Sequence, residues 1–84
     1  MVRNYLIDLR IKKDYSQRKV AYESGMSYQH YSKLESGERG GKVSLLIMGR
    51  IARTLDISLD ELYTREEEYQ NKIQRLKEKD SYEY

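Results

Sequence analysis

The connection at residues 25–27, "GMS", restricts the fold of this chain more than any other segment. Gly25 follows a helix-like run at 17–24, where a residue in the left-handed conformation can end a helix at little cost. Ser27 already precedes the next run, at 28–36, and its side-chain oxygen can cap that helix. We therefore expect two short helices that cross at a steep angle, because so short a turn leaves little other choice.

Serine and threonine residues divide the rest of the chain in the same way. Ser16, Ser27, Ser44, Ser58 and Thr64 each precede a helix-like run. Reading between these caps predicts helices at about 2–13, 17–24, 28–36, 45–54 and 59–63, followed by a tail helix at about 65–78. Strand signals are weak, since apolar and polar residues nowhere alternate over a sustained run. The expected fold class is all-α.

The expected organisation is a five-helix domain at residues 1–64 and a charged helical tail at 65–84, ending in the disordered segment "SYEY". Every helix of the domain carries an inward apolar stripe. The stripes predict one shared core, with Tyr15 and Met26 filling the turns. Its helical members are Val2, Leu6, Ile7, Leu9, Ile11, Val20, Ala21, Tyr31, Leu34, Leu45, Met48, Ile51, Ala52, Leu55, Ile57, Leu59 and Leu62.

One charged residue falls inside this apolar pattern. At about 100° per residue, Arg10 lies between Leu6 and Ile7 around the first helix, where a lone charge would be costly. Glu35 takes the matching position on the third helix, beside Leu34. We predict a partly buried ion pair between Arg10 and Glu35 that ties the first helix to the third. Its role would be architectural.

Composition excludes several classes of function. The 84 residues suffice for one small domain, and 38% hydrophobic residues favour a binding module over an enzyme with a deep cleft. Without cysteine and with one histidine, the chain offers no disulfide, thiolate site or histidine cluster. We therefore expect no catalytic residue, no metal and no cofactor. No signal peptide or long apolar run is visible, which predicts a soluble, cytoplasmic protein without a membrane segment.

The third expected helix turns a polar side outward. With Tyr31, Leu34 and Glu35 inward, its outward face carries Tyr28, Gln29, Ser32, Lys33 and Ser36, and His30 lies at the flank. Glutamine can read adenine through two hydrogen bonds, and lysine can donate to the O6/N7 edge of guanine. Such a face suits entry into a DNA major groove, N-terminus first.

The charge distribution agrees with this interpretation. Residues 1–64 contain 11 Lys/Arg and 8 Asp/Glu, whereas residues 65–84 contain 5 and 6. The excess positive charge therefore lies on the expected domain and not on the tail, as binding to a polyanion requires.

The segment "YSQRKVAYESGMSYQHYSKLESGER" resembles the lambdoid phage repressor and Cro type of helix-turn-helix, also called the xenobiotic-response-element family. The usual pattern is "LSQxxLAxxxGVSxxxISxxExG", and "SLLIMGRIARTLDISLDELY" resembles the last two helices of that family. The likeness covers about residues 3–63. Two positions depart from the pattern: Ser24, where a larger apolar residue is common, and Val43, where proline is common.

The resemblance implies roles for individual residues. Bases would be contacted by Tyr28, Gln29, Ser32 and Lys33. The DNA backbone would be contacted by Gln17, Ser27, Arg39, Gly41 and Lys42. A homodimer would span half-sites roughly 34 Å apart, with self-contact at Ile57 and Leu59 and along the tail face of Tyr69, Ile73 and Leu76. The favoured function is thus a dimeric, sequence-specific transcriptional repressor that binds double-stranded DNA.

Two other functions stay compatible with the sequence. One is an antitoxin-type autoregulator that also binds a toxin protein, and the other is a protein-interaction module that has lost DNA binding. In the second case the outward face of the third helix would be an ordinary solvated surface. The tail has alternatives too: a dimer helix, a strut docked on the domain, or a frayed helix that covers its own domain.

Overall fold

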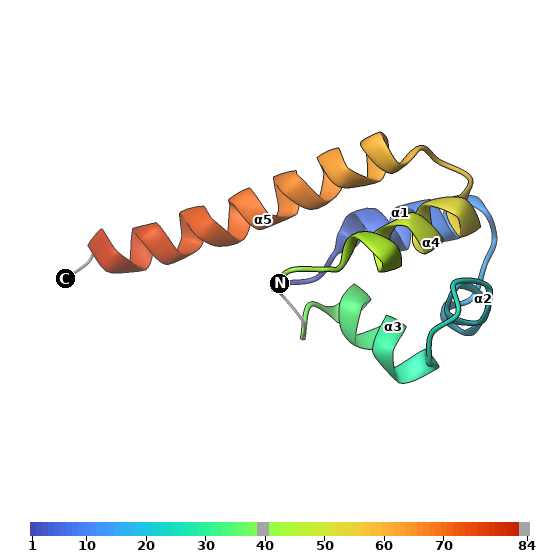
Figure 1. The fold of residues 1–84 in the computed structure, drawn as a ribbon. Helices are drawn as coiled ribbons and strands as arrows, with labels where there is room; N and C mark the ends of the chain where they lie inside the picture. The colour runs from blue at the N-terminus through green and yellow to red at the C-terminus, as the bar shows by residue number, and fades with distance from the viewer. Residues whose placement is uncertain (39–40, 83–84) are drawn as a thin grey trace.

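The computed structural model of the chain describes residues 1–38 and 41–82. These residues contain α1 (Asn4–Lys12), α2 (Gln17–Glu23), α3 (Tyr28–Ser36), α4 (Leu45–Leu55) and α5 (Leu59–Tyr82), and no β-strand. The all-α prediction is therefore confirmed. In Figure 1, α1 and α4 lie between α3 on one side and α5 on the other, and the C-terminal half of α5 projects beyond the helices that it covers.

Side-chain caps begin the helices where the sequence predicts them. Four serines each accept a hydrogen bond from the backbone N–H three residues later, at Ser16, Ser27, Ser44 and Ser58. Gly25 follows α2 with a φ of +70°, in the left-handed region that glycine adopts without a steric cost. The predicted short connection between α2 and α3 is therefore confirmed, and α2 packs against α3.

The predicted helix boundary at Thr64 is wrong, because α5 runs through it without a break. The Thr64 hydroxyl donates 3.0 Å to the backbone oxygen of Asp60, one turn earlier in the same helix, which satisfies it in a helix interior. Leu62, Glu66 and Tyr69 are buried along one face of this continuous helix. Of the C-terminal segment expected to be disordered, Ser81 and Tyr82 belong to α5, and residues 83–84 lie outside the described part.

Most of the predicted core is buried. Its buried members are Leu6, Leu9, Val20, Ala21, Tyr31, Leu34, Met48, Ile51, Ala52, Leu55 and Leu62, with Tyr15, Met26 and Ile57 packed against them. Four assignments are wrong, since Val2, Ile11, Leu45 and Leu59 are exposed. Val2 precedes α1, and Leu45 and Leu59 each begin a helix, where no preceding turn of that helix covers them.

A buried arginine that the sequence did not indicate joins three parts of the fold. Arg3 is 0% exposed. Its Nε and Nη2 atoms each donate 2.9 Å to the carboxylate of Glu66 on α5, and Nη1 donates 2.9 Å to the backbone oxygen of Leu34 on α3. The guanidinium also lies 4.4 Å from the centre of the Tyr69 ring. Burial alone would raise the pKa of Glu66, but hydrogen bonds from Arg3 and from the Tyr5 hydroxyl outweigh it and lower this pKa.

Candidate nucleic-acid interface

Packing fixes which side of α3 faces water. Tyr31, Leu34 and Glu35 are buried, with exposed fractions of 0%, 3% and 2%. At the far end, Gly37 ends the helix with a φ of +85°, and a Cβ there would lie 1.8 Å from the carbonyl oxygen of Met1. The inward stripe and both helix ends are therefore held, so the opposite face of α3 has a defined orientation.

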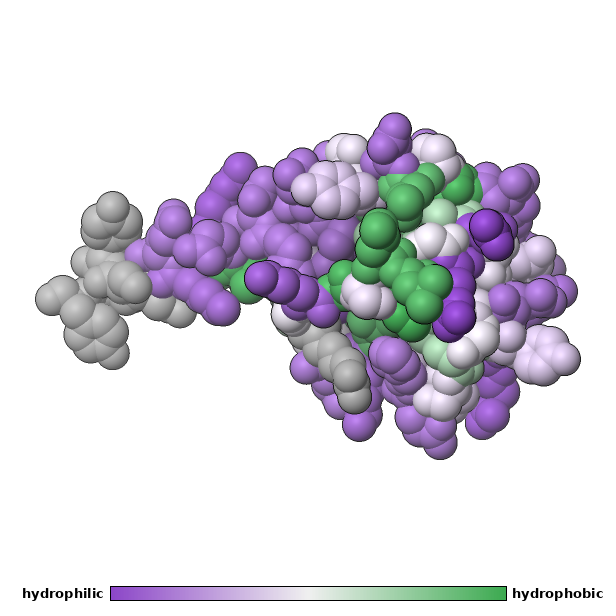
Figure 2. Space-filling model, viewed as in Figure 1, coloured by the Kyte–Doolittle hydropathy of each residue, from purple (hydrophilic) through white to green (hydrophobic). Residues whose placement is uncertain are grey.

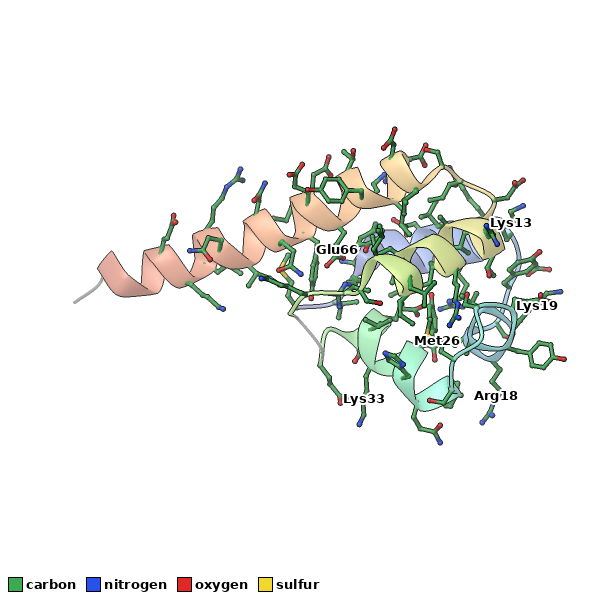
Figure 3. All side chains as sticks on the ribbon, viewed as in Figure 1. Lys13, Arg18, Lys19, Met26, Lys33 and Glu66 are labelled. Carbon is green, nitrogen blue, oxygen red and sulfur yellow. The ribbon has the colours of Figure 1, made fainter. Side chains whose placement is uncertain are left out.

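The outward face of α3 is open. Gln29, Lys33 and Ser36 are exposed, and Tyr28, His30 and Ser32 are half-buried. Figure 3 shows Lys33 pointing away from the body of the protein, on the side opposite α5. No acidic residue shares this face, because Glu35 points into the core. The side that the sequence predicted to face solvent is therefore uncovered by the rest of the described chain.

The predicted ion pair between Arg10 and Glu35 is present and is bidentate. Arg10 Nη2 and Nε donate 2.8 Å and 3.0 Å to the two carboxylate oxygens of Glu35. Burial would raise the pKa of Glu35, but the hydrogen bonds from Arg10 and Gln17 reverse the effect and lower it. The pair joins α1 to the inward side of α3 and so helps to hold the outward face in place.

The Gln17 side chain also makes a structural hydrogen bond that the sequence did not predict. Its side-chain Nε2 donates 2.8 Å to Glu35 Oε1, which orients the amide at the first position of α2. An amide nitrogen carries two N–H donors. One of them remains for a DNA phosphate, so the structural contact and the predicted backbone contact are compatible.

The turn between α3 and α4 is held by two side chains that are far from it in the sequence. Arg3 Nη2 and Gln70 Nε2 donate 3.3 Å and 3.1 Å to the backbone oxygen of Gly41. Gly41 and Lys42 are exposed, and Arg39 lies outside the described residues. The tail helix therefore holds the turn that carries part of the predicted backbone contact.

The comparison with protein families decides what kind of domain this is. A family model described as helix-turn-helix, of the Cro and lambdoid repressor type, matches residues 6–62. The chain belongs to this helix-turn-helix family. No curated protein and no solved structure matches this chain. Membership indicates a DNA-binding transcription regulator, and the family is typically not enzymatic.

In this helix-turn-helix domain, α2 and α3 are the two helices of the motif, and α3 has the place that the recognition helix takes in such motifs. Residues 1–38 and 41–82 contain no group of three or more His, Cys, Asp and Glu side chains that could bind a metal ion. Over the same stretch, no helix is both long enough and apolar enough to cross a bilayer.

The residues assigned to self-contact lie in different environments. Leu59 and Leu76 are exposed, whereas Ile57 and Ile73 are half-buried. Tyr69 is only 4% exposed, and its hydroxyl donates to the carbonyl oxygen of Met1. The assignment of Tyr69 to a dimer contact is therefore wrong, because this ring packs on Arg3 within the same chain.

Proposed function

We propose that the protein is a sequence-specific transcriptional repressor that reads a DNA operator through the outward face of α3. The observation that carries this proposal is the open, acid-free surface of Gln29, Ser32 and Lys33, which begins just after Tyr28. Gln29 and Lys33 lie one turn apart and are suited to the edges of adenine and guanine. Repression would follow from occupation of the promoter.

Contacts to the DNA backbone would fix the register of this helix in the groove. We assign them to Gln17 and Ser27 on one side of α3 and to Gly41, Lys42 and the undescribed Arg39 on the other. Such contacts release counterions, so the affinity falls steeply as the salt concentration rises.

Selection of bound sequences from a random DNA pool tests the proposal. We expect the wild-type protein to enrich a pseudo-palindrome. Gln29→Ala and Lys33→Ala should each lose base preference at one or two positions per half-site, at a cost of about 1–3 kcal/mol per position, because each removes a direct contact to a base edge.

Arg53→Ala provides the control, since Arg53 is an exposed cation on α4 and should leave the selected sequence unchanged. If wild-type protein enriches no sequence at low salt, the repressor proposal is wrong. A loss of affinity that is uniform over all sequences would move Gln29 and Lys33 to the backbone contacts.

We also propose a homodimer, formed through an apolar patch on α4 and α5. Leu45, Leu46, Leu59 and Tyr63 are exposed by 74%, 64%, 39% and 59%. Leu45, Leu59 and Tyr63 line a groove of about 660 Å³ between the start of α4 and the first turns of α5, and Leu46 is the next residue of α4 after Leu45. Figure 2 shows a contiguous hydrophobic area on this face of the protein. Contiguous exposed apolar patches on soluble proteins usually mark an interaction site.

The position of the patch suits a palindromic site. The patch faces the viewer in Figure 2, whereas Lys33 and α3 lie along the lower edge of the same view in Figure 3. A two-fold axis beside the patch, parallel to the direction in which Lys33 points, would join two patches and turn both recognition helices toward one side of a duplex. Ile73 and Leu76 would extend this contact along α5.

Leu46→Glu tests the dimer. Burying a carboxylate in the apolar contact should weaken self-association by tenfold or more, measured by sedimentation equilibrium. Ile11→Glu is the matched control, because Ile11 is 62% exposed on α1, away from the patch. A wild-type protein that stays monomeric at high concentration, or equal effects of the two variants, would contradict this interface.

A further inference from the structure

An exposed arginine on α2 stacks on the first residue of the recognition helix. The Arg18 guanidinium carbon lies 4.3 Å from the centre of the Tyr28 ring. Arg18 is exposed and makes no ion pair or hydrogen bond through its side chain with the described residues. The ring therefore fixes one face of the guanidinium while its in-plane N–H groups stay available to a ligand.

The direction of this side chain distinguishes it from its neighbour. In Figure 3, Arg18 points toward the same lower edge of the protein as Lys33, whereas Lys19 points to the side. Lys19 stacks on another ring, with its ammonium nitrogen 4.6 Å from the centre of Tyr15. Two adjacent cations of α2 are thus held by two aromatic rings, and Arg18 is the one directed to the side of the recognition face.

We propose that Arg18 binds a DNA phosphate and that the Tyr28 ring is its positioning residue. This inference rests on the proposed function, because it adds a contact to the same interface. A planar guanidinium offers parallel N–H donors that match two oxygens of a phosphate. The stacked ring holds that fork before DNA arrives, so less side-chain entropy is lost on binding.

A phosphate fits the position better than a base edge does. Arg18 belongs to α2, and in this fold the helix before the recognition helix crosses the sugar-phosphate backbone while the recognition helix enters the groove. The role of Tyr28 is then carried by its aromatic face and not by its hydroxyl. The pair would add to affinity and to salt dependence without adding to sequence preference.

The salt dependence of operator binding separates this contact from a structural role. For Arg18→Ala we expect the slope of log affinity against log salt to become shallower by about 0.9 per half-site, or about 1.8 for a dimer. Affinity at low salt should fall about tenfold or more per half-site. Lys19→Ala removes the same charge one residue away and should change the slope much less.

Tyr28 variants test the positioning role. Tyr28→Phe keeps the ring and should bind like wild type, whereas Tyr28→Leu should weaken binding in the same direction as Arg18→Ala. Combining Arg18→Ala with Tyr28→Leu should cost less than the sum of the single losses, because both remove one contact. Thermal unfolding of each variant checks that the substitutions leave the fold intact.

Each contrary result has a distinct meaning. Equal slopes for Arg18→Ala and Lys19→Ala would overturn the phosphate contact, and a changed base preference in Tyr28→Phe would overturn the positioning role. In either case Gln29→Ala would still alter the selected sequence if the proposed function holds. If Gln29→Ala also leaves the selected sequence unchanged, base reading by α3 fails as well.

Discussion

Glu66→Ala is expected to destabilise the protein by about 3–5 kcal/mol, because it leaves the guanidinium of Arg3 buried without its carboxylate. Arg3 is 0% exposed, so its charge cannot turn toward water as a surface arginine would. A chain of this length has a total free energy of unfolding of about 4–12 kcal/mol. We therefore expect urea unfolding, followed by far-UV circular dichroism, to show a large part of the stability lost.

The neighbouring acid Glu68 supplies the control for this variant. Glu68→Ala makes the same change in net charge at an exposed position two residues further along α5, and should cost less than about 0.5 kcal/mol. A loss below about 1 kcal/mol in Glu66→Ala would show that Arg3 finds another partner or water when the carboxylate is gone. That result would contradict the view that α5 is fixed to the domain through this pair.

The Arg3–Glu66 pair also shows where sequence analysis stops. Glu66 lies in the charged run "REEEYQ", which has the composition of a solvated helix face, and Arg3 precedes the first helix. Their positions are 63 residues apart, so no local spacing connects them. The same region wrongly predicted a break before residue 65. Thr64 and Glu67 have the spacing of a capping box, which is typical of a helix start, but they lie inside α5.

Local signals predicted the recognition element much better. Ser16 caps the start of α2, and Gly25 and Ser27 define the α2–α3 turn through short-range geometry. The spacing of Tyr31 and Leu34 determines the inward side of α3. Periodicity does not predict whether a residue at the start of a helix is buried or exposed. Leu45 has the right spacing for the core, yet it lies 74% exposed at the first turn of α4.

The stacking of Arg18 on Tyr28 was outside the reach of periodicity for a related reason. The two residues are ten positions apart on different helices, and their contact depends on the crossing angle set by the turn at 25–27. A helical wheel of either helix treats each side chain as independently solvated. The contact becomes visible only when both helices are placed in space.

Glu35→Ala is expected to cost roughly 3 kcal/mol, because it breaks the bidentate pair with Arg10 and removes the acceptor of the Gln17 amide. The effect should be smaller than that of Glu66→Ala. The Arg10 side chain is 17% exposed and can regain part of its hydration, whereas that of Arg3 is 0% exposed. Chemical denaturation of both variants under one set of conditions measures this order.

The pH dependence of stability provides an independent check. The pKa of Glu35 is lowered in the folded protein relative to its usual value of 4.5, so its contribution is complete above that pH and is lost as the pH falls through the folded pKa. The free energy of unfolding should therefore fall less steeply below about pH 4.5 in Glu35→Ala than in wild type. Glu23→Ala, at the exposed end of α2, should keep the wild-type slope. An unchanged slope in Glu35→Ala would mean that the ion pair with Arg10 contributes little, and that α3 is oriented by apolar packing alone.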